Sequence, residues 1–188
     1  FSKKFFFKYI KIAILFKMKK IKIPKIIKSK LHKDKRGSLK EIFRSKDYNK
    51  KFNFFLLVSS KKNVFRGFHF QKRKQQEKLV LVVKGKIIDY CLDLRKNSKT
   101  FGKIFKFVLN EKSVLFVPKG FAHGYTGLSK ENIIVYFLSE YRYSKYERGI
   151  SLFDKKIKIN LKKNKLILSK KDKRNYTISE FKKKVGSL

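Results

Sequence analysis

The sequence is poor in the residue types that cross-link chains or bind metals. Its 188 residues include one cysteine, one methionine, three histidines, two prolines and no tryptophan. A chain with one cysteine cannot form an intrachain disulfide, and no Cys/His cluster has zinc-site spacing, so we expect no metal and a reducing compartment, the cytoplasm. Cys91 lies in an apolar run and is interpreted as a buried small hydrophobe rather than a nucleophile.

Long hydrophobic runs are also missing. The apolar stretch at residues 10–16 is interrupted by Lys11 and is too short to span a bilayer, so a membrane partner is not expected, although a membrane-surface role for residues 5–16 stays open. The chain starts at Phe1, and its only methionine is Met18. We therefore predict that residues 1–17 are a non-native or disordered extension and that residues 18–188 form a single domain.

Negative charge is scarce. Thirteen Asp and Glu stand against 52 Lys and Arg, which gives a formal net charge of +39. Such an excess favours a polyanionic partner such as nucleic acid. However, the lysines are spread along the whole chain, and the excess is in Lys rather than in Arg, the residue suited to bidentate recognition of phosphates and bases. Nucleic acid is therefore not the expected partner, whereas a small anionic ligand such as a nucleotide diphosphate fits the charge.

What is present is a series of short apolar or alternating segments, separated by turns rich in Gly, Asn and Lys. This pattern predicts many short strands in an antiparallel sandwich or barrel. The predicted strands cover residues 19–31 with a break at Pro24, and then 39–44, 52–58, 63–71, 78–83, 86–94, 103–109, 113–117 and 132–138. Only the end of the chain, around residues 178–184, favours a helix.

The histidines suggest a site for proton transfer. His69 lies among apolar residues after an Arg-Gly pair, and a buried histidine with a carboxylate partner can act as a general base near neutral pH. His69, Lys78, His123 and Tyr136 lie on or beside four candidate strands, which in a jelly roll can converge on one cavity. The alternative is that they are a packing histidine, a solvated lysine at a strand end, a turn histidine and a core tyrosine.

Several motifs in a fixed order link the sequence to a known family. These motifs are Asp34-Lys-Arg-Gly-Ser-Leu-Lys-Glu41, Val64-Phe-Arg-Gly-Phe-His-Phe-Gln71, Lys78-Leu-Val with Gly85 and Asp89, Asp93-Leu-Arg-Lys-Asn-Ser98 with Thr100-Phe-Gly, Val117-Pro-Lys-Gly-Phe-Ala-His-Gly124 and Ser169-Lys-Lys-Asp172. From about Met18 to Asp172, the chain closely resembles the dTDP-4-dehydrorhamnose 3,5-epimerase family.

The resemblance implies a mainly β, cupin-like double-stranded β-helix, or jelly-roll barrel, with a short C-terminal helical segment. It implies a homodimer with an exchanged N-terminal strand, no metal or organic cofactor, and epimerisation of a dTDP-4-keto-6-deoxyhexose at C3 and C5 in dTDP-L-rhamnose biosynthesis. In the catalytic roles, His69 matches the base, Asp172 its partner, Tyr136 the acid on the other face, and Lys78 the residue near the keto oxygen. The positions that match substrate-binding residues are Arg36, Glu41, Arg66, His123, Glu147 and Lys171.

The sequence also departs from the family pattern. A polar set expected about twelve residues before the Arg-Gly-x-His motif is replaced by Phe54-Phe-Leu56. An aromatic residue expected to stack on the base falls at Arg142, an aromatic near the thymine falls at Leu39, and a late tryptophan falls at Asn160. The alternatives are therefore a related single-carbon epimerase or ketoisomerase acting on another nucleotide sugar, or a non-catalytic basic barrel that binds a polyanion.

Overall fold

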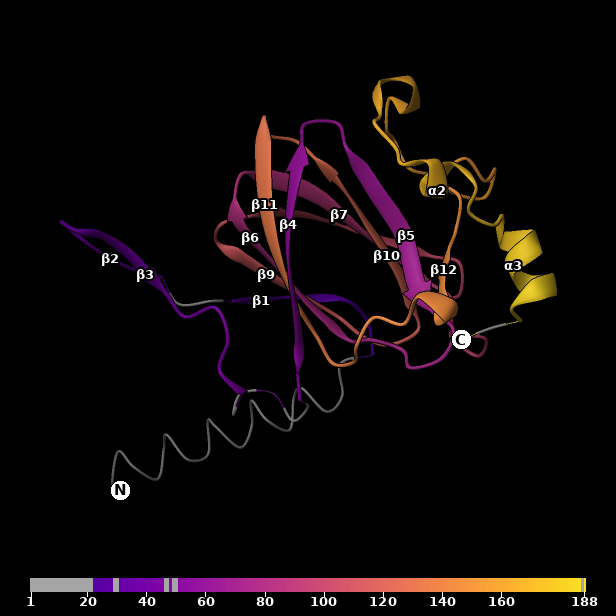
Figure 1. Cartoon of the computed structure of the whole chain (residues 1–188), viewed down its shortest axis with the longest axis horizontal. Helices are drawn as coiled ribbons and strands as arrows, with labels where there is room; N and C mark the ends of the chain where they lie inside the picture. Colours follow the sequence, from indigo (N-terminus) through magenta and orange to yellow (C-terminus); the bar gives the residue numbers. More distant parts are fainter. Residues whose placement is uncertain (1–21, 29–30, 46–47, 49–50, 187) are drawn as a thin grey trace.

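Two facing five-stranded sheets make up most of the computed structural model (Figure 1). The structure describes residues 22–28, 31–45, 48, 51–186 and 188. The first sheet has the strand order β1-β9-β6-β11-β4 and consists of β1 Lys25–Lys28, β9 Ser113–Val117, β6 Lys78–Lys84, β11 Glu131–Leu138 and β4 Phe54–Lys61. The second has the order β12-β5-β10-β7-β8 and consists of β12 Glu147–Gly149, β5 Phe65–Gln71, β10 Phe121–Gly127, β7 Lys86–Asp93 and β8 Ile104–Asn110.

The chain changes sheet at nearly every step, because β4, β6, β9 and β11 lie in the first sheet while β5, β7, β8 and β10 lie in the second. All named strand pairs are antiparallel. This interleaved order is that of a jelly-roll barrel, so the predicted fold class is confirmed. Inward residues of both sheets, including Val80, Ile134 and Tyr125, form one core between them.

Two further segments lie outside the barrel. A hairpin of β2 Leu31–Asp34 and β3 Gly37–Lys40 projects away from the two sheets (Figure 1). The C-terminal segment packs on the outer face of the second sheet, where Phe181 contacts Phe70 in a second core cluster. The helical elements are η2 Ser144–Tyr146, η3 Lys163–Lys165, α2 Lys170–Lys173 and α3 Ile178–Lys184. In the part of the chain that the structure describes, no helix is long and apolar enough to cross a membrane.

Most predicted elements are confirmed, and the helix at residues 178–184 matches α3. One strand prediction was wrong and one strand was missed. Residues 41–44 are not part of a strand, since β3 ends at Lys40, which pairs with the first residue of β2. No strand was predicted over residues 121–127, where β10 lies between β5 and β7 with all its residues buried. The predicted extension at residues 1–17 lies outside the described residues.

Candidate active site

The first sheet supplies one wall of a cavity. The register between strands places Tyr136 of β11 between Leu56 of β4 and Val80 of β6. Residues paired directly across antiparallel strands point to the same face, so these three side chains form one row. Two residues further along β11, Leu138 pairs with Lys78. Tyr136 and Lys78 therefore lie close together on the inward face of the sheet.

The second sheet supplies the opposite wall. His69 of β5 pairs with His123 of β10, and the register shifts between His123 and Tyr125. Gly67 has a φ of +130°, and a Cβ there would overlap the backbone of Gly124. A glycine at position 67 is therefore what lets β5 and β10 approach closely enough to bring both histidines into one wall.

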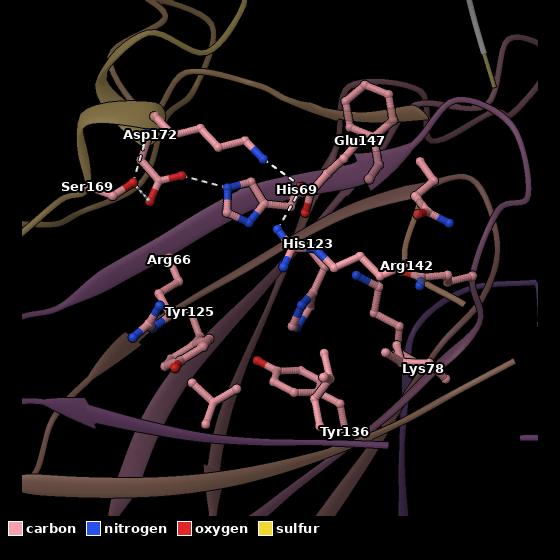
Figure 2. Close-up of a pocket in the computed structure, with 17 residues that line it drawn as sticks. Arg66, His69, Lys78, His123, Tyr125, Tyr136, Arg142, Glu147, Ser169 and Asp172 are labelled. Carbon is pink, nitrogen blue, oxygen red and sulfur yellow. Dashed lines mark hydrogen bonds and ion pairs between the residues drawn. The ribbon is translucent and has the colours of Figure 1, made fainter. Parts of the chain in front are cut away.

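The two walls enclose a cavity of about 330 Å³ (Figure 2). A cavity of this size lies within the range of small-molecule sites. Charged, polar and apolar side chains line it together. These residues are Leu56, Val58, Arg66, His69, Phe70, Gln71, Gln76, Lys78, His123, Tyr125, Tyr136, Leu138, Arg142, Glu147, Ser169, Lys171 and Asp172.

His69 and Asp172 form a close pair at the cavity wall. Nε2 of His69 lies 2.6 Å from Oδ1 of Asp172, and the carboxylate side chain is 4% exposed against 29% for the histidine. Burial alone would raise the pKa of Asp172, but hydrogen bonds from His69, Ser169 and Asn175 outweigh burial and hold that pKa below its usual range. The carboxylate therefore stays charged and orients the imidazole.

A short helix positions this carboxylate. Ser169 is the N-cap of α2, where its hydroxyl oxygen accepts a hydrogen bond from the backbone N–H of Asp172 at 3.1 Å. The same hydroxyl donates to Oδ2 of Asp172 at 2.9 Å. The serine thus fixes both the helix start and the rotamer of the carboxylate.

Tyr136 faces the histidines from the other sheet (Figure 2). Its ring contacts that of His123 edge-to-face, with the centroids 5.8 Å apart. Burial raises the pKa of the Tyr136 phenol well above its ordinary value, with further contributions from Tyr125 and Asp89. The phenol is therefore protonated at neutral pH and can donate a proton. Burial lowers the pKa of Lys78, against the opposing influence of Cys91, Glu147 and Asp89.

Three charged residues meet at one side of the cavity. Glu147 of β12 accepts a hydrogen bond from Lys171 at 2.6 Å and from Arg142 at 3.0 Å. Burial would raise its pKa, but these two partners lower it to about 2. Because Lys171 precedes Asp172 in α2, the ion pair also ties that helix to the barrel.

The cavity brings together eight of the ten predicted site residues and leaves two outside it. The eight are His69, Tyr136, Asp172, Lys78, Arg66, His123, Glu147 and Lys171. Arg36 lies in the turn of the β2–β3 hairpin, is 85% exposed and pairs with Asp34 at 2.8 Å. Glu41 follows β3 and pairs with Arg44. Neither Arg36 nor Glu41 lines the cavity within the described part of this single chain.

Sequence reasoning assigned no role to several residues that complete the site. Asp89 is fully buried, and its Oδ2 lies 2.7 Å from Nε2 of His123, which gives a second His–Asp pair behind the cavity wall. Tyr125 and Arg66 share Ser60, whose hydroxyl oxygen is 2.7 Å from the Tyr125 hydroxyl and 3.0 Å from Nε of Arg66. Once β10 is recognised as a strand, its pairing with β7 is the signal that would have brought Asp89 to His123.

The chain is similar in sequence to proteins of one known family. A family model described as dTDP-4-dehydrorhamnose 3,5-epimerase matches residues 19–180. The dTDP-4-dehydrorhamnose 3,5-epimerase of Methanothermobacter thermautotrophicus is 36% identical over 158 residues, which cover 79% of this chain and 85% of the relative. The corresponding protein of Shigella flexneri is 37% identical over 164 residues, covering 81% and 91%.

A solved structure shows the same architecture. The dTDP-6-deoxy-D-glucose-3,5-epimerase of Legionella pneumophila, in complex with dTDP-4-keto-L-rhamnose, superposes with a TM-score of 0.82 at 30% identity, covering 88% of this chain and 93% of that one. The resemblance found in the sequence motifs is therefore confirmed, together with the cupin-like barrel.

Proposed function

Because the chain belongs to the dTDP-4-dehydrorhamnose 3,5-epimerase family, we propose that it epimerises a dTDP-4-keto-6-deoxyhexose at C3 and C5, in the biosynthesis of dTDP-L-rhamnose. The observation that carries the proposal is the placement of the His69–Asp172 pair and Tyr136 on opposite walls of one cavity. Inversion at carbon requires a base on one face of the sugar ring and an acid on the other.

His69 removes the proton next to the ketone in this proposal. The imidazole takes the proton, and the buried Asp172 carboxylate at 2.6 Å stabilises the imidazolium that results. The carbon then receives a proton on the opposite face from the Tyr136 phenol, which its buried surroundings keep protonated. Only protons move, so the reaction itself calls for no redox cofactor.

Lys78 is the residue we assign to the keto oxygen. A proton beside a ketone becomes acidic when the enolate oxygen is stabilised, and one well-placed donor in a comparable oxyanion site contributes about 3–4 kcal/mol. Lys78 lies on the same wall as Tyr136, two positions along the paired strand β11. A lysine with a pKa lowered by burial can also release and recover a proton more readily than an exposed one.

The cations in the cavity suit a nucleotide diphosphate. Arg66, Arg142 and Lys171 line it, and Lys171 and Arg142 are held by Glu147. Arginine binds phosphate oxygens with two parallel hydrogen bonds, and lysine contributes a point charge. We assign Arg66, Lys171, Glu147 and His123 to substrate binding.

Arg36 and Glu41 are assigned to binding in a homodimer with an exchanged N-terminal strand. Both lie on or just after the β2–β3 hairpin, which projects from the barrel, so they would serve the cavity of a second copy (Figure 1). The outer face of the first sheet offers an apolar contact surface, where Leu57 is 73% and Phe55 51% exposed. We place the reaction in the cytoplasm, since a single buried cysteine suits a reducing compartment.

A second candidate is a related 4-keto-sugar epimerase that acts on one carbon or on another nucleotide sugar. It is favoured by the apolar side chains of Leu56, Val58 and Leu138, which line the wall beside Tyr136. The family pattern has polar residues where this chain has Phe54-Phe-Leu56, and Leu56 is part of this wall. A sugar that presents an apolar edge there would fit it better than one that presents a hydroxyl group.

Turnover of dTDP-4-keto-6-deoxyglucose by the wild type, His69→Ala and Tyr136→Phe variants tests the proposal. Both variants should keep the fold, judged by circular dichroism, and lose about 100-fold or more in kcat, the usual contribution of a positioned acid or base. Tyr136→Phe should still exchange the substrate proton with solvent, because His69 remains. Wild-type turnover in both folded variants would contradict the assignment.

A further inference from the structure

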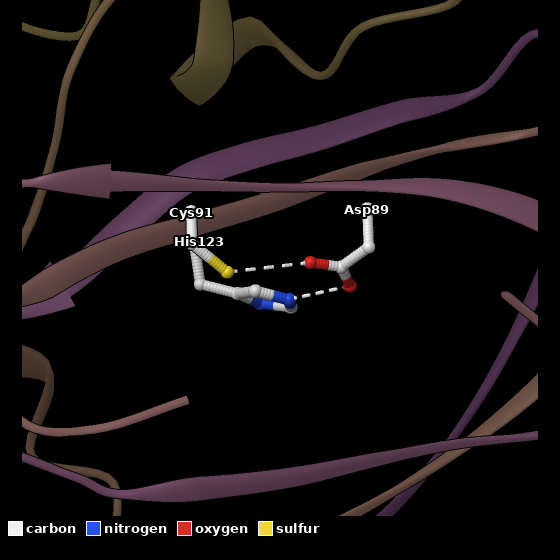
Figure 3. A group of neighbouring side chains, drawn as sticks. All are labelled: Asp89, Cys91 and His123. Carbon is white, nitrogen blue, oxygen red and sulfur yellow. Dashed lines mark hydrogen bonds and ion pairs between the residues drawn. The ribbon is translucent and has the colours of Figure 1, made fainter. Parts of the chain in front are cut away.

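A compact group of nitrogen, oxygen and sulfur donors lies behind the cavity wall. Asp89, Cys91 and His123 are all buried, and their ligand atoms lie within 4.8 Å of one another (Figure 3). The pairing of β7 with β10 creates the group, because His123 is directly opposite Cys91 and Asp89 lies two residues before Cys91 on the same face of β7. Three donor types on two rigid strands are a pre-organised set.

We propose that Asp89, Cys91 and His123 bind a divalent metal ion of the zinc class, and that the bound ion inhibits the enzyme. Histidine nitrogen, cysteine thiolate and aspartate oxygen are the ligands that zinc takes in proteins, and three protein ligands with one open position are typical of an accessible site. Binding of the ion does not depend on the proposed function. Inhibition by the ion does, because it requires that the chain be an epimerase.

The distances support coordination. With ordinary zinc bond lengths, a tetrahedral ion separates a sulfur from an oxygen ligand by about 3.6 Å and a nitrogen from an oxygen ligand by about 3.4 Å. Sγ of Cys91 lies 3.6 Å from Oδ1 of Asp89, and Nε2 of His123 lies 2.7 Å from Oδ2 of Asp89. The sulfur–oxygen distance matches the required separation. The two contacts use different oxygens of the Asp89 carboxylate, so an ion held by all three side chains replaces both hydrogen bonds, and the imidazole moves away from Oδ2.

The charges also balance. The Asp89 carboxylate and a Cys91 thiolate together neutralise a divalent ion. Coordination displaces the thiol proton of Cys91, since zinc binds the thiolate form.

Inhibition follows from what the ion displaces. His123 lines the cavity, while Asp89 and Cys91 lie behind it, so an ion arriving through the cavity replaces the hydrogen bond between His123 and Asp89. His123 is assigned to substrate binding, so an ion that takes its Nε2 withdraws this residue from the substrate, and turnover would fall.

Cobalt titration of the metal-stripped full chain tests the site. Cys91 is the only cysteine of the sequence, so a thiolate-to-cobalt charge-transfer band identifies its ligation without ambiguity. We expect one cobalt ion per chain with this band, displaced by zinc. In Cys91→Ser the band should vanish and zinc affinity should fall by about 100-fold or more, at least the loss caused by removing an outer-shell partner. His32→Ala, which removes an exposed histidine on β2, should bind as the wild type does.

Activity gives the second readout. Zinc should lower the wild-type rate in proportion to occupancy, and the ratio of the rates with and without zinc should move towards one in Cys91→Ser. A folded wild type without the cobalt band, or a Cys91→Ser variant with unchanged zinc affinity, overturns the site. Cobalt binding with the band in a chain that turns over no nucleotide sugar would contradict the proposed function and leave the metal site standing.

Discussion

At the scale of single residues, the site is built from side chains that are far apart in sequence and adjacent in space. His69 and Asp172 are 103 positions apart, yet their side chains are 2.6 Å from each other. The carboxylate is buried and still charged, because three hydrogen-bond donors compensate for its burial. The activity of such a base depends on the negative charge of its partner as well as on the histidine itself.

Replacing Asp172 by Asn tests that dependence. The amide keeps the size of the side chain but removes the charge that stabilises the imidazolium, so kcat should fall by about 100-fold or more. The matched control is Ser169→Ala, which removes one hydrogen bond to the carboxylate and leaves its charge. It should lose less activity than Asp172→Asn. Steady-state kinetics measure both, and a kcat of Asp172→Asn within twofold of the wild type would contradict the role of the pair.

At the scale of elements, short segments position the chemistry. Helix α2 has only four residues, and the cap at Ser169 and the ion pair from Lys171 to Glu147 hold it. Glu147 lies on β12, which pairs with β5 at Gln71, two residues beyond His69. The carboxylate of Glu147 therefore connects the strand that carries the base with the helix that carries its partner.

Acid should loosen this connection. The pKa of Glu147 is about 2 in the fold against an ordinary 4.5, so its contribution to stability is present above pH 4.5 and is lost as the pH falls towards about 2. Its partners Arg142 and Lys171 are 57% and 50% exposed, so solvent screening limits this contribution to about 1–2 kcal/mol.

Glu147→Gln is the variant that isolates this contribution. The difference in the free energy of unfolding between wild type and variant, measured by denaturant titration, should be greatest near neutral pH and should shrink through that window. Parallel stability curves for the two proteins between neutral and low pH would show that the ion pair does not stabilise the fold.

The sequence allowed the strands to be predicted better than their pairing. The apolar runs on either side of Lys84–Gly85 suggest a hairpin, but the strands that they form, β6 and β7, lie in different sheets. The Thr177–Glu180 capping box at the start of α3 is a local signal that is visible in the sequence. Strand β10 has no such signal, because it is buried on both faces and carries two glycines, Gly124 and Gly127. The contact between Asp89 and His123 depends on the pairing of β10 with β7. Because the sequence did not indicate β10, this part of the site could not be predicted from the sequence.

Family motifs supplied the remaining site predictions. Nothing in the local pattern indicates that Asp172 reaches His69, since α2 is a single turn in a lysine-rich segment. The motif ending at Asp172 did indicate it, because such motifs preserve contacts that composition and periodicity do not encode.

At the scale of the whole molecule, charge and assembly dominate. A chain of 188 residues with a formal net charge of +39 has strong repulsion between its like charges. The proposed homodimer would carry twice this charge. In the proposed homodimer, contact between the exposed apolar residues on the outer face of the first sheet would oppose this repulsion. The projecting hairpin carries Arg36, which can bind substrate only if the hairpin reaches the cavity of a second copy.

Light scattering tests the assembly. The wild type should have about twice the 22.5 kDa mass of one chain, and Leu57→Glu should shift it towards a single chain, because it places a charge in the proposed apolar contact. Val108→Glu is the matched control, since Val108 is exposed on β8 of the opposite sheet. A wild type with the mass of one chain at micromolar concentration would contradict the proposed dimer.

The most direct test of the central claim is incorporation of solvent deuterium into dTDP-4-keto-6-deoxyglucose, followed by NMR. We expect exchange at C3 and C5 with the wild type and none with a folded His69→Ala variant, because His69 is the base that we propose for both positions. Exchange at one carbon would identify a single-carbon epimerase. No exchange with the folded wild type, or undiminished exchange in His69→Ala, would contradict the account.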